Sequence, residues 1–266
     1  RVHRASPQRP SVMGILNVTP DSFSDGGDYL TPEAALRRAE EMVRDGARII
    51  DVGGESTRPG AAPVPPDEEL RRVLPVIRLL AKQVRVIISI DTSKAEVARC
   101  AIEEGAAMVN DVSALRRDPK MAGVIARARV PVILMHRRGT PQTMQRAPRY
   151  RDVVGEVQRF LKEAITRAVA AGIPRRRLLI DPGLGFGKTV RHNLELLRHL
   201  DAFSDLGCAI VIGPSRKSFI GHTLQAPVEE RVEGTLACVA SAMRHCVDIV
   251  RVHDVKPTVL FITMWR

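Results

Sequence analysis

Short apolar segments alternate with longer amphipathic segments along the whole chain. Eight of the apolar segments are rich in Val and Ile and lack a strict alternation of polar and apolar residues, which predicts parallel strands buried on both faces. These segments cover residues 11–17, 48–52, 84–90, 107–110, 130–136, 177–181, 208–213 and 248–252.

Amphipathic segments between the strands predict helices. Thr31 is expected to cap the first helix, with Pro32 at its first position and Gly46 after its end. Pro75 is expected to kink the second helix. The expected helices cover residues 31–46, 65–83, 92–105, 118–128, 151–172, 189–200, 228–245 and a short segment after residue 254.

The regular strand–helix repeat has no obvious linker. It predicts one α/β domain, a single (β/α)₈ TIM barrel over residues 1–266, with residues 1–10 as a poorly ordered N-terminal extension. A doubly wound open sheet is the alternative. That fold usually carries a G-x-G-x-x-G turn after its first strand, and the chain has none at that place.

Composition narrows the class of protein. The net charge is +11, but the arginines are scattered among acidic and apolar positions and aromatics are only 3%, so nucleic acid is not the expected partner. No apolar run is long enough for a membrane span, and no secretory leader is visible. Four cysteines without C-x-x-C spacing fit a reduced, cytoplasmic protein.

Polar residues are concentrated directly after the predicted strands. In a TIM barrel these post-strand loops form the catalytic face, so side chains distant in sequence are expected to share one opening. All eight loops contribute candidates, which are Asn17, Glu55, Ser56, Thr57, Arg58, Asp91, Asn110, His136, Asp181, Lys217, Arg251 and His253.

Eight blocks of sequence carry a resemblance to a known family, in order and over residues 11–256. They are NVTPDSFSDGG, DVGGESTRPGA, SIDTSK, VNDVSAL, LMHRRGTPQTMQ, LIDPGLGFGKT, GPSRKSFIG and RVHDV. The chain resembles the dihydropteroate synthase family. The resemblance implies a transferase of folate biosynthesis that joins 6-hydroxymethyl-7,8-dihydropterin diphosphate to p-aminobenzoate and releases pyrophosphate. Two departures are the basic pair Arg137-Arg138 and the tail after Val255, which puts the last helix in doubt.

The pterin edge presents an array of N–H donors, and carboxylates and amides held rigidly at strand ends are suited to it. Two acids in one cavity repel each other, so a nearby cation is expected. Taken singly, Asp91 could instead cap a helix and Asp181 could be a turn residue. With the family resemblance, the expected pterin-binding residues are Asp91, Asn110, Asp181 and Lys217, with Met135 and Phe186 as apolar walls.

The diphosphate needs a clamp for its negative charge. Strands one and eight are neighbours in a closed barrel, which places Asn17, Arg251 and His253 together on one side. Thr57 and Arg58 are expected to join this clamp. Mg²⁺ is the expected cofactor, held by few protein groups, and Asn17 resembles the family's metal contact.

The amine site follows from the resemblance. Phe23 and Pro59 are expected to cover the p-aminobenzoate ring. Its carboxylate is expected at Ser218, at the start of a helix opened by SRKS, where free N–H groups favour anions. Asp25 is expected to face a cation formed as the diphosphate leaves, so the expected catalytic residues are Asp25, Lys217 and Asp91. The first two loops are expected to order only over bound ligands. Sulfonamides, as mimics of the amine, are expected to compete at this site.

Other interpretations stay open at this point. A pterin-dependent methyltransferase domain shares a carboxylate-lined pterin pocket, and a non-catalytic pterin-binding or phosphate-binding protein is a third possibility. His136 has no assigned role. No nucleophile–base constellation predicts covalent catalysis. The expected partners are small-molecule substrates and a second copy of the chain in a homodimer, with the apolar stretch Cys238 to Met243 available for that contact.

Overall fold

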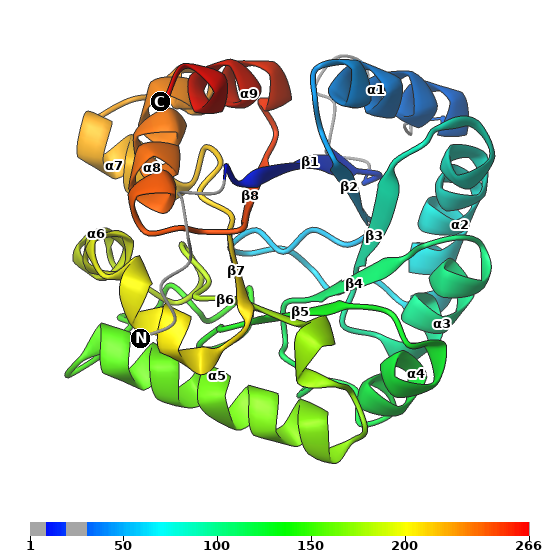
Figure 1. Cartoon of the computed structure of the whole chain (residues 1–266), viewed down its shortest axis with the longest axis horizontal. Helices are drawn as coiled ribbons and strands as arrows, with labels where there is room; N and C mark the ends of the chain where they lie inside the picture. Colours follow the sequence, from blue (N-terminus) through cyan, green and yellow to red (C-terminus); the bar gives the residue numbers. More distant parts are fainter. Residues whose placement is uncertain (1–8, 20–30, 266) are drawn as a thin grey trace.

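Eight parallel strands close into a barrel surrounded by helices in the computed structural model, which describes residues 9–19 and 31–265 (Figure 1). Each strand pairs with the next in the sequence, and β8 pairs with β1. The predicted single TIM barrel is therefore confirmed. Phe23, Asp25 and most of the expected N-terminal extension lie outside the described residues.

The strands are short, and each of the eight predicted segments overlaps one. Their bounds are β1 Ser11–Asn17, β2 Ile49–Gly53, β3 Ile87–Asp91, β4 Met108–Asp111, β5 Val132–Met135, β6 Leu178–Asp181, β7 Ala209–Ile212 and β8 Ile249–Val252.

The helices form the outer layer. Their bounds are α1 Pro32–Arg44, α2 Pro66–Gln83, α3 Ala95–Glu103, α4 Met121–Ala128, α5 Val153–Ala170, α6 Val190–Arg198, α7 Ser218–Leu224, α8 Val232–Arg244 and α9 Val255–Met264. Short 3₁₀ helices lie at η2 Arg175–Arg177, η3 Leu200–Leu206 and η4 Val228–Glu230.

Helix termini largely follow the sequence signals. The Thr31 hydroxyl accepts a hydrogen bond from the backbone N–H of Ala34 at 3.2 Å, which is the predicted cap of α1. Helix α2 is one assigned helix that includes Pro75. Helix α7 begins at Ser218, where a helix was expected, but it was not among the helices predicted from periodicity, because seven residues are too few to show a helical period. Helix α9 completes the barrel despite its unusual tail sequence.

Two apolar layers hold the barrel together. The larger one lies between the strands and the helices. The smaller one fills the lower barrel interior with Met13, Ile49, Met108, Ile133, Leu179, Val211 and Ile249. Successive side chains in a strand point to opposite faces, so residues two positions further along the same strands face the interior at a higher level. Those positions include Asp51, Asn110, Met135, Asp181 and Arg251.

Strand register fixes a row of polar residues at the carboxyl ends of the strands, which we call the barrel mouth. Asn17 is paired with Gly53, Gly53 with Asp91, and Asp91 with Asn110. Gly53 leaves the row open, because a Cβ there would lie 3.6 Å from both Asn17 Oδ1 and Asp91 Cβ. Four strands therefore bring residues at their carboxyl ends to one place, although these residues span 93 positions of sequence from 17 to 110.

Two other features bear on earlier expectations. All four cysteines are free thiols, as expected for a protein without disulfides. Within the described residues, no helix combines the length and the apolar character needed to cross a bilayer.

In the stretch Cys238 to Met243, the side chains of Cys238, Val239, Ala242 and Met243 are buried within the chain itself. Ala240 and Ser241 are the partly exposed residues of this stretch, so its contribution to a dimer contact stays a prediction.

Candidate active site

An arginine and two aspartates form the centre of the barrel mouth. Arg251 on β8 donates from Nε to Asp51 Oδ2 at 2.6 Å and from Nη2 to Asp91 Oδ2 at 2.8 Å. The amide of Asn110 donates to the same Asp51 oxygen at 2.9 Å. Asp51 is completely buried and Asp91 is 7% exposed. One cation therefore crosses the mouth and joins strands β8, β2 and β3.

Asp91 is held in an environment that disfavours its charge. Burial raises the pKa of Asp91 to about 7, although Arg251 acts in the opposite direction. The negative charges of Asp51, Glu69 and Asp111 raise it further. Within the described part of the chain, Asp51 Oδ1 has no hydrogen-bond partner. The cluster therefore has more acceptor capacity than its single arginine fills, and donors from a ligand suit it.

Asp181 and Lys217 lie on the opposite side of the mouth. Asp181 Oδ1 accepts a 2.7 Å hydrogen bond from Gly183 N, and burial raises the pKa of this carboxyl while Lys217 lowers it. The Lys217 ammonium donates to the carbonyl of Leu184 and lies 4.3 Å from the centre of the Phe186 ring. Burial lowers the pKa of Lys217 to about 8. Lys217 is therefore close to losing its proton near neutral pH.

An apolar wall completes this side. Val112, Met135, Met144 and Phe186 form a small hydrophobic cluster that is separate from both layers of the barrel core. Met135 is 4% exposed and Phe186 is 8% exposed. Because this cluster is distinct from the core and adjoins Lys217, it favours the interpretation of Met135 and Phe186 as walls for a flat ring.

The β6–α6 loop is anchored from beneath by a buried lysine. Lys188 Nζ lies 2.9 Å from His136 Nδ1 and donates to the carbonyls of Gly183 at 2.8 Å and Phe186 at 3.1 Å. Burial lowers the pKa of His136 to about 2, so the ring is neutral and its Nδ1 accepts from the lysine. His136, which the sequence left open, therefore supports the loop that carries Phe186.

His253, after β8, is oriented by a serine of the β7–α7 loop. Ser215 Oγ accepts from His253 N at 3.0 Å and lies 2.9 Å from His253 Nδ1, a pair in which either atom can be the donor. Burial lowers the pKa of His253 to about 4, and the charges of Arg251, Arg58 and Arg216 lower it further. The serine therefore orients a neutral ring, and a hydroxyl that donates to Nδ1 leaves the ring proton on Nε2.

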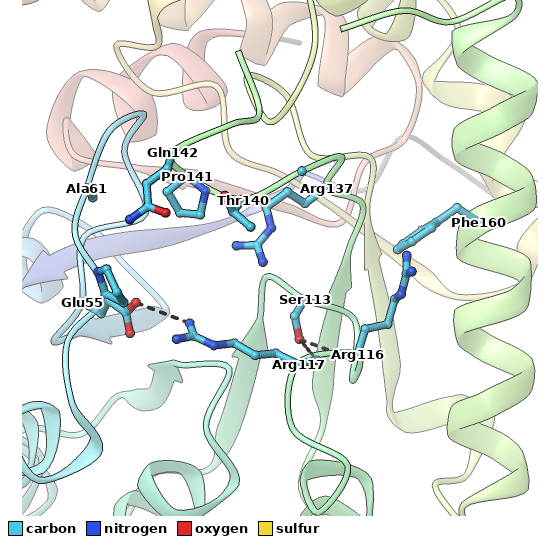
Figure 2. Close-up of a pocket in the computed structure, with 12 residues that line it drawn as sticks. Glu55, Ala61, Ser113, Arg116, Arg117, Arg137, Thr140, Pro141, Gln142 and Phe160 are labelled. Atoms are coloured by element: carbon cyan, nitrogen blue, oxygen red, sulfur yellow. Dashed lines mark hydrogen bonds and ion pairs between the residues drawn. The ribbon is translucent and has the colours of Figure 1, made fainter. Parts of the chain in front are cut away.

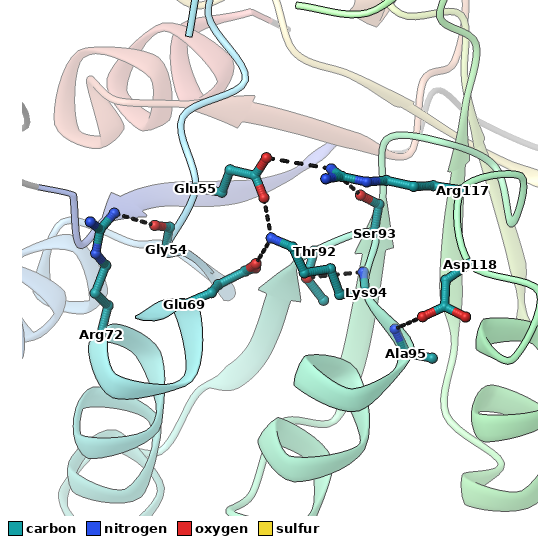
Figure 3. Close-up of polar contacts among 10 residues, drawn as sticks. All are labelled: Gly54, Glu55, Glu69, Arg72, Thr92, Ser93, Lys94, Ala95, Arg117 and Asp118. Carbon is teal, nitrogen blue, oxygen red and sulfur yellow. Dashed lines mark hydrogen bonds and ion pairs between the residues drawn. The ribbon is translucent and has the colours of Figure 1, made fainter. Parts of the chain in front are cut away.

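Glu55, in the β2–α2 loop, is tied to the scaffold. Lys94 donates to Glu55 and to the fully buried Glu69 of α2, as Figure 3 shows. Arg117, from the β4–α4 loop, reaches Glu55 Oε1 at 3.4 Å and Ser93 Oγ at 3.1 Å. This network attaches the base of the loop that carries Thr57, Arg58 and Pro59, while Arg58 and Pro59 themselves are exposed.

The structure brings most predicted residues to the mouth but gives two of them different neighbours. Arg251, expected at the diphosphate, pairs with Asp51 and Asp91. Lys217, expected to neutralise the acids, lowers the pKa of Asp181 and donates its hydrogen bond to the Leu184 carbonyl. Ser218 begins α7 as expected and is exposed. Sequence reasoning missed Asp51, Ser215, Lys188 and the pair Arg117 and Arg137. A charged residue inside a buried strand was a usable signal for Asp51.

Comparisons with known proteins agree with this geometry. The family model described as "Pterin binding enzyme" matches residues 13–253. The dihydropteroate synthase of Escherichia coli (strain K12) is 50% identical over 250 residues, which cover 94% of this chain and 88% of that protein.

Solved structures agree as well. Yersinia pestis dihydropteroate synthase with a sulfonamide drug complex has a TM-score of 0.93 and 46% identity, covering 98% of this chain and 94% of that one. Xanthomonas albilineans dihydropteroate synthase with 4-aminobenzoic acid has a TM-score of 0.91 and 50% identity, covering 97% and 93%. The chain belongs to the dihydropteroate synthase family of pterin-binding enzymes, which are transferases.

Proposed function

We propose that the barrel mouth carries out this family's condensation, in which p-aminobenzoate displaces pyrophosphate from 6-hydroxymethyl-7,8-dihydropterin diphosphate to give 7,8-dihydropteroate. The observation that carries the proposal is the row of buried acids and amides at the strand ends. Asp91 and Asn110 are adjacent in register, and Asp181 lies across the mouth beside Lys217. These groups match the donor and acceptor edges of a pterin.

The pterin ring binds between the polar row and the apolar wall. Asp91 and Asp181 accept from ring N–H groups, and Lys217 donates to the acceptor edge. Met135 and Phe186 contact the ring face. The Lys217 ammonium already lies over the Phe186 ring at 4.3 Å, so a bound pterin completes a stack against a cation. Asp51 acts through Arg251, by holding the guanidinium at 2.6 Å.

The diphosphate binds on the β1–β8 side. Arg251 supplies charge, and His253 donates from Nε2 because Ser215 occupies Nδ1. Thr57 and Arg58 approach from the β2–α2 loop. Asn17 ends β1 beside Gly53, and its amide oxygen is a hard donor of the kind Mg²⁺ accepts.

Magnesium fits this side only as an ion carried mainly by the diphosphate. Among residues 9–19 and 31–265, no cluster of three His, Cys, Asp or Glu side chains is placed to bind a metal. Asn17 would be its protein ligand, and diphosphate oxygens and water would supply the rest. When bound, the ion would neutralise charge on the departing pyrophosphate.

The amine approaches over the first two loops. We assign Pro59 and Ser218 to the p-aminobenzoate ring and carboxylate, together with Phe23 and Asp25 outside the described residues. The Xanthomonas albilineans relative was solved with 4-aminobenzoic acid, which supports an amine site in this fold. An arylamine is a neutral nucleophile, so this step requires exclusion of water and negative potential rather than a general base.

The proposal is tested by pyrophosphate release from the pterin diphosphate with and without p-aminobenzoate and Mg²⁺. Release that depends on both additions and yields pteroate is the expected result. Binding without turnover contradicts it and identifies a non-catalytic pterin protein. Transfer of a methyl group from a reduced pterin, without pyrophosphate release, would identify a methyltransferase instead.

Assembly and location complete the proposal. We propose a cytoplasmic homodimer that acts on small molecules and not on nucleic acid or membranes. The scattered arginines and the four free thiols support this setting. Light scattering with size-exclusion chromatography tests the dimer, and a single species of 29.3 kDa contradicts it.

A further inference from the structure

A cavity lies beside the barrel mouth, and none of its lining residues is assigned to the proposed reaction. It has a volume of about 510 Å³ and lies between the loops that follow β2, β4 and β5 (Figure 2). Its lining residues include Arg116, Arg117 and Arg137 against one acid, Glu55. The Glu55 carboxylate already forms ion pairs with Lys94 and Arg117. The cavity wall therefore carries an excess of positive charge.

The three arginines differ in how they are paired. Arg117 donates to Glu55 and Ser93, and Arg116 lies 5.4 Å from the centre of the Phe160 ring. Arg137 has no hydrogen-bond or ion-pair partner in the described part of the chain, although burial and the charge of Arg117 both lower its pKa. Figure 2 shows its guanidinium directed into the cavity from the β5–α5 loop.

An unpaired guanidinium in a partly desolvated place is costly unless a ligand meets it. Its planar fork of N–H donors matches phosphate oxygens two at a time. The Arg137-Arg138 pair is one of the chain's departures from the family pattern, so the charge is not a requirement of the shared reaction. We propose that this cavity is a second oxyanion site, which binds a phosphate group of a small molecule between Arg137 and Arg117.

The cavity wall is joined to the substrate loops. Gly60, at the tip of the β2–α2 loop, donates its N–H to the carbonyl of Pro141 in the β5–α5 loop at 2.9 Å. Pro141 lines the cavity, and Ala61 beside Gly60 lines it too. A phosphate group held here contacts both loops, so its binding is expected to stabilise the loop that carries Arg58 and Pro59.

Calorimetric titration with orthophosphate at low ionic strength tests the site. Arg137→Gln is expected to weaken binding by about tenfold, the effect of one charge-assisted hydrogen-bond pair. Arg137→Lys, which keeps the charge but loses the fork, is expected to be intermediate. Arg138→Gln is the matched control, because it removes the neighbouring charge from a side chain that bonds Arg149 and Glu156 outside the cavity. Melting curves of all variants verify folding.

Hydrogen exchange identifies where the anion is bound. Orthophosphate is expected to slow exchange in residues 60–63 and 139–142 of the wild type and of Arg138→Gln, but not of Arg137→Gln. Pyrophosphate, the second probe, reports on residues 251–253 as well, where the proposed diphosphate clamp lies. If the proposed function is wrong, pyrophosphate will not slow exchange in residues 251–253, while the effect of orthophosphate on residues 60–63 and 139–142 will remain. The two proposals therefore fail separately.

Two results would overturn the inference. One is equal orthophosphate affinity in Arg137→Gln and Arg138→Gln. The other is binding of succinate as strongly as of orthophosphate with the same dependence on Arg137, which would assign the cavity to carboxylates instead.

Discussion

The barrel mouth and the arginine-lined cavity beside it differ in how completely their charges are paired. At the strand ends, Arg251 is locked between Asp51 and Asp91 by side-chain hydrogen bonds, and the register of the strands sets their positions. In the arginine-lined cavity, Arg137 has no such partner among the described residues and comes from a loop. The mouth is suited to one rigid ring, and the cavity has a guanidinium available for an anionic ligand.

Removal of Asp91 is expected to have the largest effect on this contrast. Asp91→Ala removes both a pterin acceptor and one of the two partners of buried Arg251. Breaking such a buried pair lowers the free energy of unfolding by about 3–5 kcal/mol. Loss of the charged acceptor for the ring is expected to lower pterin affinity by about a hundredfold. Calorimetry with a pterin ligand measures the affinity, and near-normal affinity in the folded variant would refute the pterin assignment.

A pair of glycine variants tests whether one side is packed and the other open. Gly183 has φ +70°, and a Cβ there would lie 1.9 Å from the carbonyl oxygen of His136. Gly60 has φ +85°, and a Cβ there meets nothing within 4 Å. Gly183→Ala is expected to lower the free energy of unfolding by about 3 kcal/mol, and Gly60→Ala by about 1 kcal/mol from backbone strain alone.

Urea unfolding measures both glycine variants. Equal losses would mean that the contact between the β6–α6 loop and His136 contributes nothing. Gly183→Ala should also weaken pterin binding, because the same loop carries Phe186.

The pH dependence of pterin binding sharpens the comparison at the paired side. Bound pterin donates to the Asp91 carboxylate, whose pKa in the free protein is raised to about 7. Below that pH the carboxyl must lose a proton on binding, so affinity is expected to fall about tenfold for each unit of pH. Above about 8 it falls again as Lys217 loses its proton. Calorimetry in buffers of different ionisation enthalpy should show proton release on the acidic side, and a flat profile would contradict the prediction.

The smallest expected effect is at Ser215. Ser215→Ala leaves His253 free to place its proton on either ring nitrogen, which removes about 1 kcal/mol of hydrogen bonding. Pyrophosphate affinity is expected to fall about fivefold. Ser215→Thr keeps the hydroxyl and should restore most of the affinity. No change in Ser215→Ala would mean that the serine does not set the orientation of His253.

Sequence periodicity was sufficient to predict the barrel and the strand-end positions. Asp91 and Asp181 are the last residues of their strands and Asn110 is the last but one of its strand, so their arrival at one mouth follows from parallel strand geometry alone. Periodicity did not predict the short helix α7, because seven residues are too few to show a helical period. The helix predicted over residues 65–83 is present as α2, with Pro75 inside it. The last helix, α9, forms although the family pattern is lost there.

Pairing within the site was much less predictable. Nothing in the sequence distinguishes which acids Arg251 meets, since Asp51 lies 200 positions away. Lys188 and His136 are 52 positions apart, and their contact depends on how the β6–α6 loop folds back over β5. The cavity around Arg137 is lined by residues from three loops, so it depends on the conformation of all three. Spacing predicts which strand end a residue occupies, but loop conformation decides which group it touches.

The register of β1 to β4 separates ring recognition from the loops that choose the second substrate. Asn17, Gly53, Asp91 and Asn110 keep their spacing through interstrand hydrogen bonds. An exchange of the β2–α2 or β5–α5 loop for one of different length would leave that spacing intact. Such a scaffold can accept a different amine, or lose affinity for an inhibitor that resembles the amine, while the residues proposed to bind the pterin ring stay in place.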